Sequence, residues 1–188
     1  MASPSLTSPQ IPGYVAGAWN IDPIHSDVSF TVRHMMVSKV RGRFATFQGQ
    51  INTAANFLES SVNASVDLAS IGTNNEQRDA HIRSADFFEV EKYPTMTFNS
   101  TSVRADGEGY LLAGDLSLHG VTRAVEFALE FNGFTKDPYG GTRAGFSAHT
   151  QINRRDYGVN INMPMDGGGA VVGDKIDIAL EVEAVLQA

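Results

Sequence analysis

The chain contains no cysteine, and this absence removes three kinds of chemistry at once. Without thiols it forms no disulfide bond, no thiolate zinc site and no cysteine nucleophile. The five histidines do not supply a metal site instead, because they show neither a His-x-His pair nor the helical spacing that brings two imidazoles to one ion. We therefore expect no metal and no catalytic cofactor.

An excess of basic residues is also absent. The 14 lysines and arginines are outnumbered by 21 aspartates and glutamates, which gives a formal net charge of -7. Such a surface disfavours nucleic acid and acidic membranes as partners through general electrostatics. We expect no nucleic-acid partner, and an anionic ligand would have to meet a local basic patch.

Long apolar runs are missing as well. No stretch is apolar over the thickness of a bilayer, and the start MASPSLTSPQIPGYVAGAWN has neither the basic segment nor the apolar core of a secretory signal. We therefore expect a soluble, cytoplasmic protein that does not span a membrane. The sequence leaves both a monomer and a homodimer open.

The sequence does contain a regular alternation of apolar and polar residues. Residues 1 to 18 are rich in Ser, Pro and Gly without periodicity, which predicts a flexible N-terminal tail. From residue 19 to 188 the alternation recurs in segment after segment, as is typical of half-buried strands. Turn signals such as Asp106-Gly107 favour antiparallel hairpins. We predict a single all-β domain with about eight strands.

Such strands pack as a sandwich or close into a barrel, and closure removes exposed edges. We predict an extended eight-stranded antiparallel β-barrel, with the sandwich as the alternative. The alternation breaks between Leu68 and Pro94, where Thr73-Asn74-Asn75-Glu76 has the spacing of a helical capping box. A short helical insertion is therefore expected near residues 74 to 90.

The residues predicted to face inward are almost all apolar. An eight-stranded barrel can hold one small ligand, so a ligand inside this one should be apolar over most of its length. The alternative is a solid core that these side chains fill completely. The predicted cavity residues are Phe30, Val32, His34, Phe47, Val66, Phe87, Phe88, Phe98, Leu116, Phe127, Leu129, Phe146, Ile178 and Leu180.

Residues 28 to 58 contain four basic residues and no Asp or Glu. Two of the four, Arg41 and Arg43, share strand parity with Phe47, so in a regular strand they point into the barrel near one end. We predict that they form a polar mouth suited to the anionic head of an amphiphile. A bulge at Gly42 would reverse this parity, and the alternative is an outer hairpin whose charges face solvent.

Four segments resemble a known family. They are IDPIHSDVSFTVRHMMVSKVRGRF, SIGTNNEQRDAHIRSADFFEVEKYPTMTF, GDLSLHGVTRAVEF and INRRDYGV, which follow one another in this order. Together they resemble the YceI-like family, the lipocalin-like polyisoprenoid-binding proteins, over roughly residues 19 to 186. The resemblance implies an extended barrel with a helical element near one end, a hydrophobic cavity for a long isoprenoid chain and no established enzymatic activity.

These observations predict a non-catalytic protein that sequesters or transports a long-chain polyisoprenoid or similar amphiphile, such as a prenyl pyrophosphate or an isoprenoid quinone. The alternative is a small hydrolase or isomerase that acts on an apolar or prenyl substrate with His34 or His81 as general base. The sequence shows no Gly-x-Ser-x-Gly motif and no other recognisable nucleophile. We therefore expect no enzymatic activity.

Overall fold

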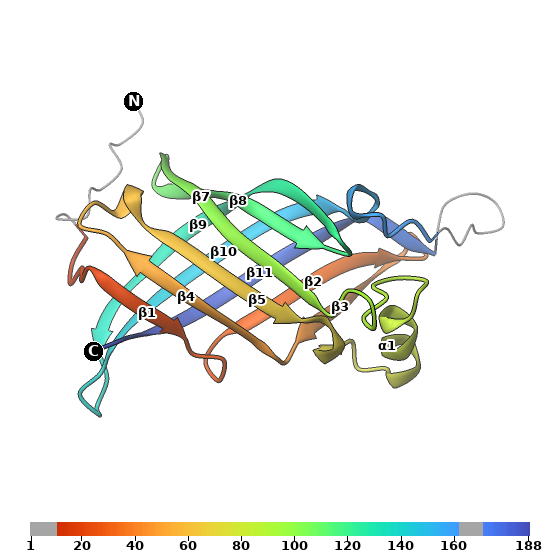
Figure 1. Ribbon diagram of the computed structural model, residues 1–188, viewed down its shortest axis with the longest axis horizontal. Helices are drawn as coiled ribbons and strands as arrows, with labels where there is room; N and C mark the ends of the chain where they lie inside the picture. The colour runs from red at the N-terminus through yellow and green to blue at the C-terminus, as the bar shows by residue number, and fades with distance from the viewer. Residues whose placement is uncertain (1–10, 162–170) are drawn as a thin grey trace.

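The computed structural model describes residues 11 to 161 and 171 to 188, which form a β-barrel with one α-helix near one end (Figure 1). The strands are β1 (Gly17–Ile21), β2 (Asp27–His34), β3 (Ser38–Phe44), β4 (Phe47–Thr53), β5 (Ser61–Asp67), β6 (Ile71–Gly72), β7 (Thr95–Asp106), β8 (Gly109–Leu118), β9 (Val121–Lys136), β10 (Thr142–Asn153) and β11 (Val172–Leu186). The helices within these residues are α1 (Glu76–Arg83) and the 3-10 turns η2 (Phe57–Glu59), η3 (Leu68–Ser70) and η4 (Arg154–Tyr157).

Eight strands close the barrel. Their order is β1-β4-β5-β7-β8-β9-β10-β11, every described pairing is antiparallel, and β1 returns to pair with β11. Strand β11 pairs with β1 at its C-terminal end and with β2 over its earlier residues, so β2 and β3 lengthen the wall on one side. The predicted eight-stranded barrel is confirmed, and the sandwich alternative is excluded.

The helical insertion is confirmed, but its N-cap is not the predicted residue. Helix α1 begins after Asn75, whose side chain accepts a hydrogen bond from the backbone N–H of Arg78 at 2.9 Å. The Thr73 hydroxyl instead donates to the carboxylate of Asp79, which is buried and also accepts the Thr73 N–H. Turns rather than helix follow Arg83 as far as residue 92. Among the described residues, no helix has the length and apolar character needed to cross a membrane.

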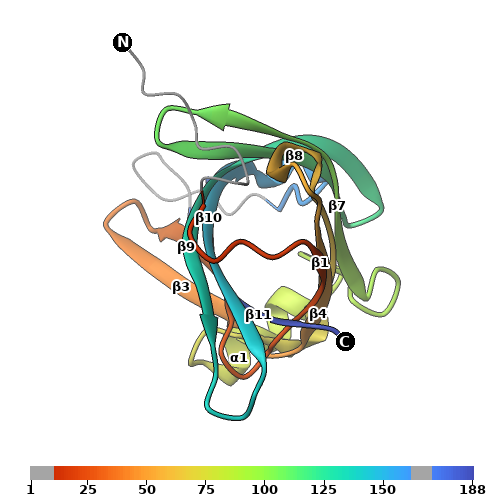
Figure 2. The ribbon, with the colours of Figure 1, turned by 90° about the vertical axis from the view of Figure 1, so that its left-hand side faces the viewer.

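The end of the barrel opposite α1 is closed by the chain's first described residues. Figure 2 shows them, in red, running across this end. Ile11 is 8% exposed, and the Tyr14 ring packs edge-on against Phe57 and Phe134. Trp19, which is fully buried, donates its indole N–H to the Thr53 hydroxyl at 2.8 Å. The predicted flexible tail is therefore wrong for residues 11 to 18, while residues 1 to 10 lie outside the described part of the chain.

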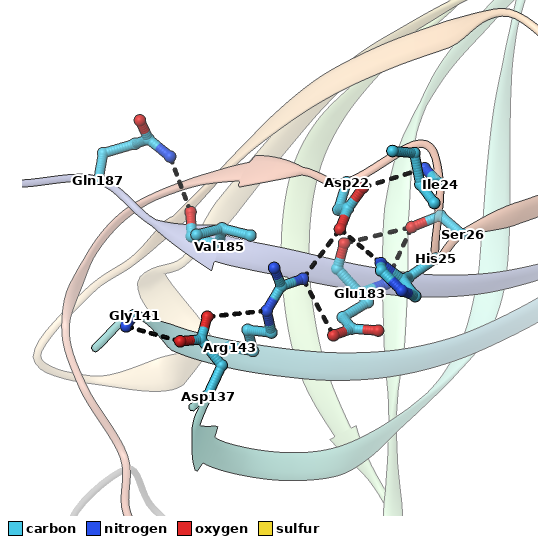
Figure 3. A network of polar contacts seen from close by, with 10 residues as sticks. All are labelled: Asp22, Ile24, His25, Ser26, Asp137, Gly141, Arg143, Glu183, Val185 and Gln187. Carbon is cyan, nitrogen blue, oxygen red and sulfur yellow. Dashed lines mark hydrogen bonds and ion pairs between the residues drawn. The ribbon is translucent and has the colours of Figure 1, made fainter. Parts of the chain in front are cut away.

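A network of charges fastens the β1–β2 connection to the outer wall (Figure 3). The Arg143 guanidinium lies 2.8 Å from Asp22, 3.1 Å from Glu183 and 3.1 Å from Asp137. His25 Nδ1 lies 2.7 Å from the same Asp22 carboxylate. The network joins residues from β10, β11, the β9–β10 turn and the loop after β1, so it holds four distant parts of the sequence together.

The Asp22 network should make the fold sensitive to acid. The hydrogen bond from His25, followed by the one from Arg143, lowers the pKa of Asp22 from 3.8 to about 2. Because the folded pKa is the lower one, this stabilisation is complete above about pH 4 and is lost as the pH falls through about 2. A shift of this size is worth at most about 2.5 kcal/mol.

Urea unfolding of the wild type and Asp22→Asn, at neutral pH and near pH 2, measures this contribution. We expect the variant to be less stable at neutral pH and the difference to vanish in acid. Asp115→Asn on the exposed outer face of β8 is the matched control. A stability difference that persists unchanged in acid would mean that Asp22 acts through packing instead of charge.

Candidate ligand-binding cavities

Two adjoining cavities lie inside the barrel. The first, of about 240 Å³, is bounded by α1, the segment after it, β2, β3 and the N-terminal half of β11. The second, of about 150 Å³, lies deeper, among the side chains of β4, β5 and β7 to β11. Val28, Met96 and Ile178 line both cavities and form the boundary between them. The walls of both present carbon almost throughout, so the barrel interior is suited to an apolar molecule.

All fourteen predicted cavity residues line these spaces. Their contact with a ligand stays a prediction, but the solid-core alternative is excluded for the described residues. Those at the first cavity are Phe30, Val32, His34, Phe87, Phe88 and Ile178, and those at the second are Phe47, Val66, Phe98, Leu116, Phe127, Leu129, Phe146, Ile178 and Leu180. Val28 and Met96 were missed as cavity residues, although both follow the same alternation along their strands.

Arg41 and Arg43 do not form a mouth, so that prediction is wrong. Along β3 the buried or half-buried residues are Val40, Gly42 and Phe44, and the two arginines between them are exposed. Arg43 is 70% exposed at its side chain and pairs with Asp27 at 2.8 Å on the outside. The parity with Phe47 fails because Ala45 and Thr46 interrupt the strand, so inward residues change parity between β3 and β4.

Three of the polar residues that border the first cavity, Arg78, His81 and Arg154, have their charged ends occupied. Arg78 donates to the Thr73 hydroxyl at 2.8 Å and to its carbonyl at 2.6 Å, and His81 Nε2 lies 2.8 Å from Asp86. Arg154 is 4% exposed and donates to backbone carbonyl groups of the chain that follows it. These side chains therefore turn mainly their carbon stems toward the cavity.

Glycines on the inner wall keep the cavities open. Phe30 on β2 is directly opposite Gly42 on β3, and a Cβ at Gly42 would lie 2.2 Å from the tip of the Phe30 ring. Phe98 covers Gly114 in the same way, at 2.5 Å. Because a glycine has no side chain, each ring can lie against the wall and leave the lumen free.

Gly42→Ala should push the Phe30 ring into the first cavity. The backbone at Gly42 tolerates any L-residue, so the clash is with the ring and costs about 1–3 kcal/mol of overpacking at most. We expect weaker binding of an apolar ligand, measured by titration, in a barrel with an unchanged circular dichroism spectrum. Gly72→Ala is the matched control, because no atom lies within 4 Å of its Cβ position. Equal affinities for both variants would show that the first cavity does not hold the ligand.

The comparison with protein families identifies this architecture. The model of the YceI-like domain matches residues 19–184. The chain belongs to the YceI-like family. A UPF0312 protein of Vibrio cholerae is 41% identical over 163 residues, which cover 86% of this chain and 82% of the relative. A UPF0312 protein of Staphylococcus epidermidis is 37% identical over 167 residues, covering 88% and 95%.

Solved structures share the YceI-like barrel. A Campylobacter jejuni YceI protein is 28% identical with a TM-score of 0.70 and covers 83% of this chain and 90% of its own. BcnA of Burkholderia cenocepacia has a TM-score of 0.73 at 21% identity, covering 87% and 98%. A polyisoprenoid binding domain of Saccharophagus degradans, implicated in plant cell wall breakdown, has a TM-score of 0.69 at 17% identity, covering 92% and 100%. The last two show likeness of fold alone.

Three of the YceI-like sequence segments meet in a structural contact. His119 Nδ1 lies 3.0 Å from the Tyr157 carbonyl, and the Tyr93 ring packs edge-on against the imidazole at 4.9 Å. The same Tyr93 ring lies 2.6 Å from the Cβ position of Gly120, so only glycine fits there. The polar residues of these segments thus fix loops at the α1 end, while Phe87 and Phe88 contribute to the cavity wall.

Proposed function

We propose that this protein binds a long-chain polyisoprenoid or similar amphiphile without transforming it, and so sequesters or carries it. The observation that carries the proposal is the pair of carbon-walled cavities enclosed by the barrel. The Saccharophagus degradans neighbour, described as a polyisoprenoid binding domain, has the same fold and supports this choice of ligand. A continuous apolar wall discriminates between ligands by the length and flexibility of their carbon chains more than by their polar groups.

The cavities are small for a long chain as they stand. Ordinary ligand pockets measure about 300–1,000 Å³, against about 240 and 150 Å³ here. A long ligand therefore has to pass the boundary formed by Val28, Met96 and Ile178. Met96 is suited to yield, because a thioether side chain is unbranched and adopts many shapes at low cost.

Burial of the ligand's carbon chain provides ample free energy for the ligand to pass this boundary. Each buried methylene is worth about 0.8 kcal/mol, so an isoprene unit of five carbons contributes up to roughly 4 kcal/mol before ordering costs. The head group adds little inside the barrel. The charged ends of Arg78, His81 and Arg154 are occupied, and Arg33, which also borders the first cavity, is exposed. We accordingly favour a neutral end group, such as a quinone, over a pyrophosphate.

Native mass spectrometry of the purified protein, with organic extraction of the same preparation, tests the proposal. We expect a bound apolar lipid or, from a stripped preparation, stoichiometric uptake of an added isoprenoid quinone that is recovered unchanged. If repeated preparations carry no lipid and take up no isoprenoid, the proposal fails. Turnover of a prenyl ester that is lost in His34→Ala, in a variant that still folds and binds, would establish the enzyme alternative instead.

A further inference from the structure

The turn between β2 and β3 exposes apolar side chains at the tip of a hairpin. Met35, Met36 and Val37 are 42%, 50% and 89% exposed. Met35 and Met36 also have φ values of 52° and 62°, in the left-handed region that residues other than glycine, Asn and Asp seldom adopt. The turn therefore holds three neighbouring apolar residues in water, two of them in an unfavourable backbone conformation.

The outer face of this hairpin is basic. Arg33 is directly opposite Lys39 across the two strands, and Arg41 and Arg43 follow on the same face of β3. Like charges placed directly opposite repel each other unless an anion lies between them. Within the described residues, Arg33, Lys39 and Arg41 form no ion pair, and only Arg43 has a partner, Asp27.

Acidic residues lie near the hairpin, but they do not outnumber its basic residues. Asp174 and Asp177 share a surface groove with Arg33, Met36 and Lys39. Asp174 pairs with Arg154 and Arg155 at 3.1 and 2.9 Å, and Asp177 accepts a hydrogen bond from Gln151 at 2.9 Å. Arg155 and Lys175 lie in the same groove, so its four basic residues outnumber its two acidic ones. The hairpin therefore keeps a local positive excess, although the whole chain carries a net charge of -7.

We propose that the β2–β3 hairpin docks this protein on an anionic phospholipid surface. In this arrangement Met36 and Val37 enter the acyl region, and the unpaired basic residues on the outer face contact lipid phosphates. An apolar tip flanked by cations is complementary to a bilayer, whose surface is anionic and whose interior is apolar. The protruding shape of the tip also fits a fluid surface, because a rigid protein partner would need a matching groove.

The position of the hairpin links this surface to the first cavity. Val32 and His34 on β2 and Val40 on β3 line that cavity on the inner face, while the cations project from the outer face. The hairpin lies at the same end of the barrel as α1 (Figure 1). Docking would bring the α1 end of the barrel against the bilayer, where apolar lipids reside. The docking itself does not depend on what the cavity binds.

Tryptophan substitutions at the two ends of the barrel test the proposal. Val37→Trp places a reporter at the tip, and Tyr139→Trp places one at the 93%-exposed residue of the β9–β10 turn as the matched control. With vesicles of phosphatidylcholine and phosphatidylglycerol, we expect a blue shift of emission for the first variant only, and none with pure phosphatidylcholine. No shift, or equal shifts for both variants, would overturn the proposal.

Flotation with the same vesicles, using variants without an added tryptophan, measures how much the basic face and the apolar tip each contribute to membrane binding. Lys39→Gln with Arg41→Gln should lower partitioning about 30-fold at low salt, because each basic residue near the surface gives roughly a 5-fold gain. Val37→Ser should lower it about 10-fold in low and moderate salt alike. If instead Val37→Trp emission shifts with protein concentration in the absence of vesicles, a second copy of the chain covers the tip and the membrane proposal is wrong.

Discussion

Ile178→Asp is expected to abolish binding of an apolar ligand. Ile178 lines both cavities, so a carboxylate there meets the ligand at the boundary between them. A charge enclosed in an apolar site costs several kcal/mol, and even the protonated acid leaves polar atoms unpartnered. We expect a loss of affinity of more than about 100-fold, measured by titration with an isoprenoid quinone.

The neighbouring residue on β11 provides the control. Ala179 is exposed and faces outward, so Ala179→Asp makes a similar chemical change on the same strand without touching either cavity. Its affinity should equal that of the wild type. If Ile178→Asp does not fold, Ile178→Phe narrows the same place with carbon and should also weaken binding. Full affinity in a folded Ile178 variant would show that the ligand does not pass between the two cavities.

Phe57→Ala should cost about 3–5 kcal/mol of unfolding free energy. The Phe57 ring is 3% exposed and packs against the rings of Tyr14, Tyr110 and Phe131 at 6.2, 4.8 and 5.7 Å. Its removal leaves a void beneath the segment that closes the end opposite α1, and these aromatic neighbours cannot collapse fully into it. Urea unfolding monitored by circular dichroism measures the loss.

An exposed aromatic residue provides the control, because it shows how much unfolding free energy is lost when a ring that is not buried is removed. Tyr139 is 93% exposed, so Tyr139→Ala should change the unfolding free energy by less than about 0.5 kcal/mol. A loss below about 1 kcal/mol for Phe57→Ala, in a cooperative transition of unchanged slope, would mean that this end of the barrel contributes little to stability.

The inward residues were predictable because antiparallel strands alternate strictly between two faces. Along β9 and β11 the pattern placed Phe127, Leu129, Ile178 and Leu180 on the inner wall without knowledge of the register. The pattern failed for Arg41 and Arg43 because the alternation was assumed to continue unchanged from β3 into β4, whereas Ala45 and Thr46 separate the two strands. Those two residues end β3 without glycine, proline, Asn or Asp, the usual signals of a turn.

Two further differences arise from contacts that composition and residue spacing do not reveal. The composition of residues 11 to 18 resembles that of a loose tail, yet Ile11 belongs to the buried core and Tyr14 packs on rings from η2 and β9 that are distant in sequence. At the start of α1, Thr73 matched the capping-box spacing, but its hydroxyl is used by Asp79 and the cap falls to Asn75. Contacts with residues distant in the sequence decide the first case, whereas a hydrogen bond to a residue six positions further along the chain decides the second.

The affinity of the wild-type protein for a series of neutral prenols of increasing length is the most direct measurement of the central claim. If the chain occupies the two cavities, affinity should rise steeply with each added isoprene unit and level off once both are filled. The rise should be much smaller in Ile178→Asp. Absence of binding, or an affinity that is the same for every chain length, would contradict an apolar lumen as the binding site.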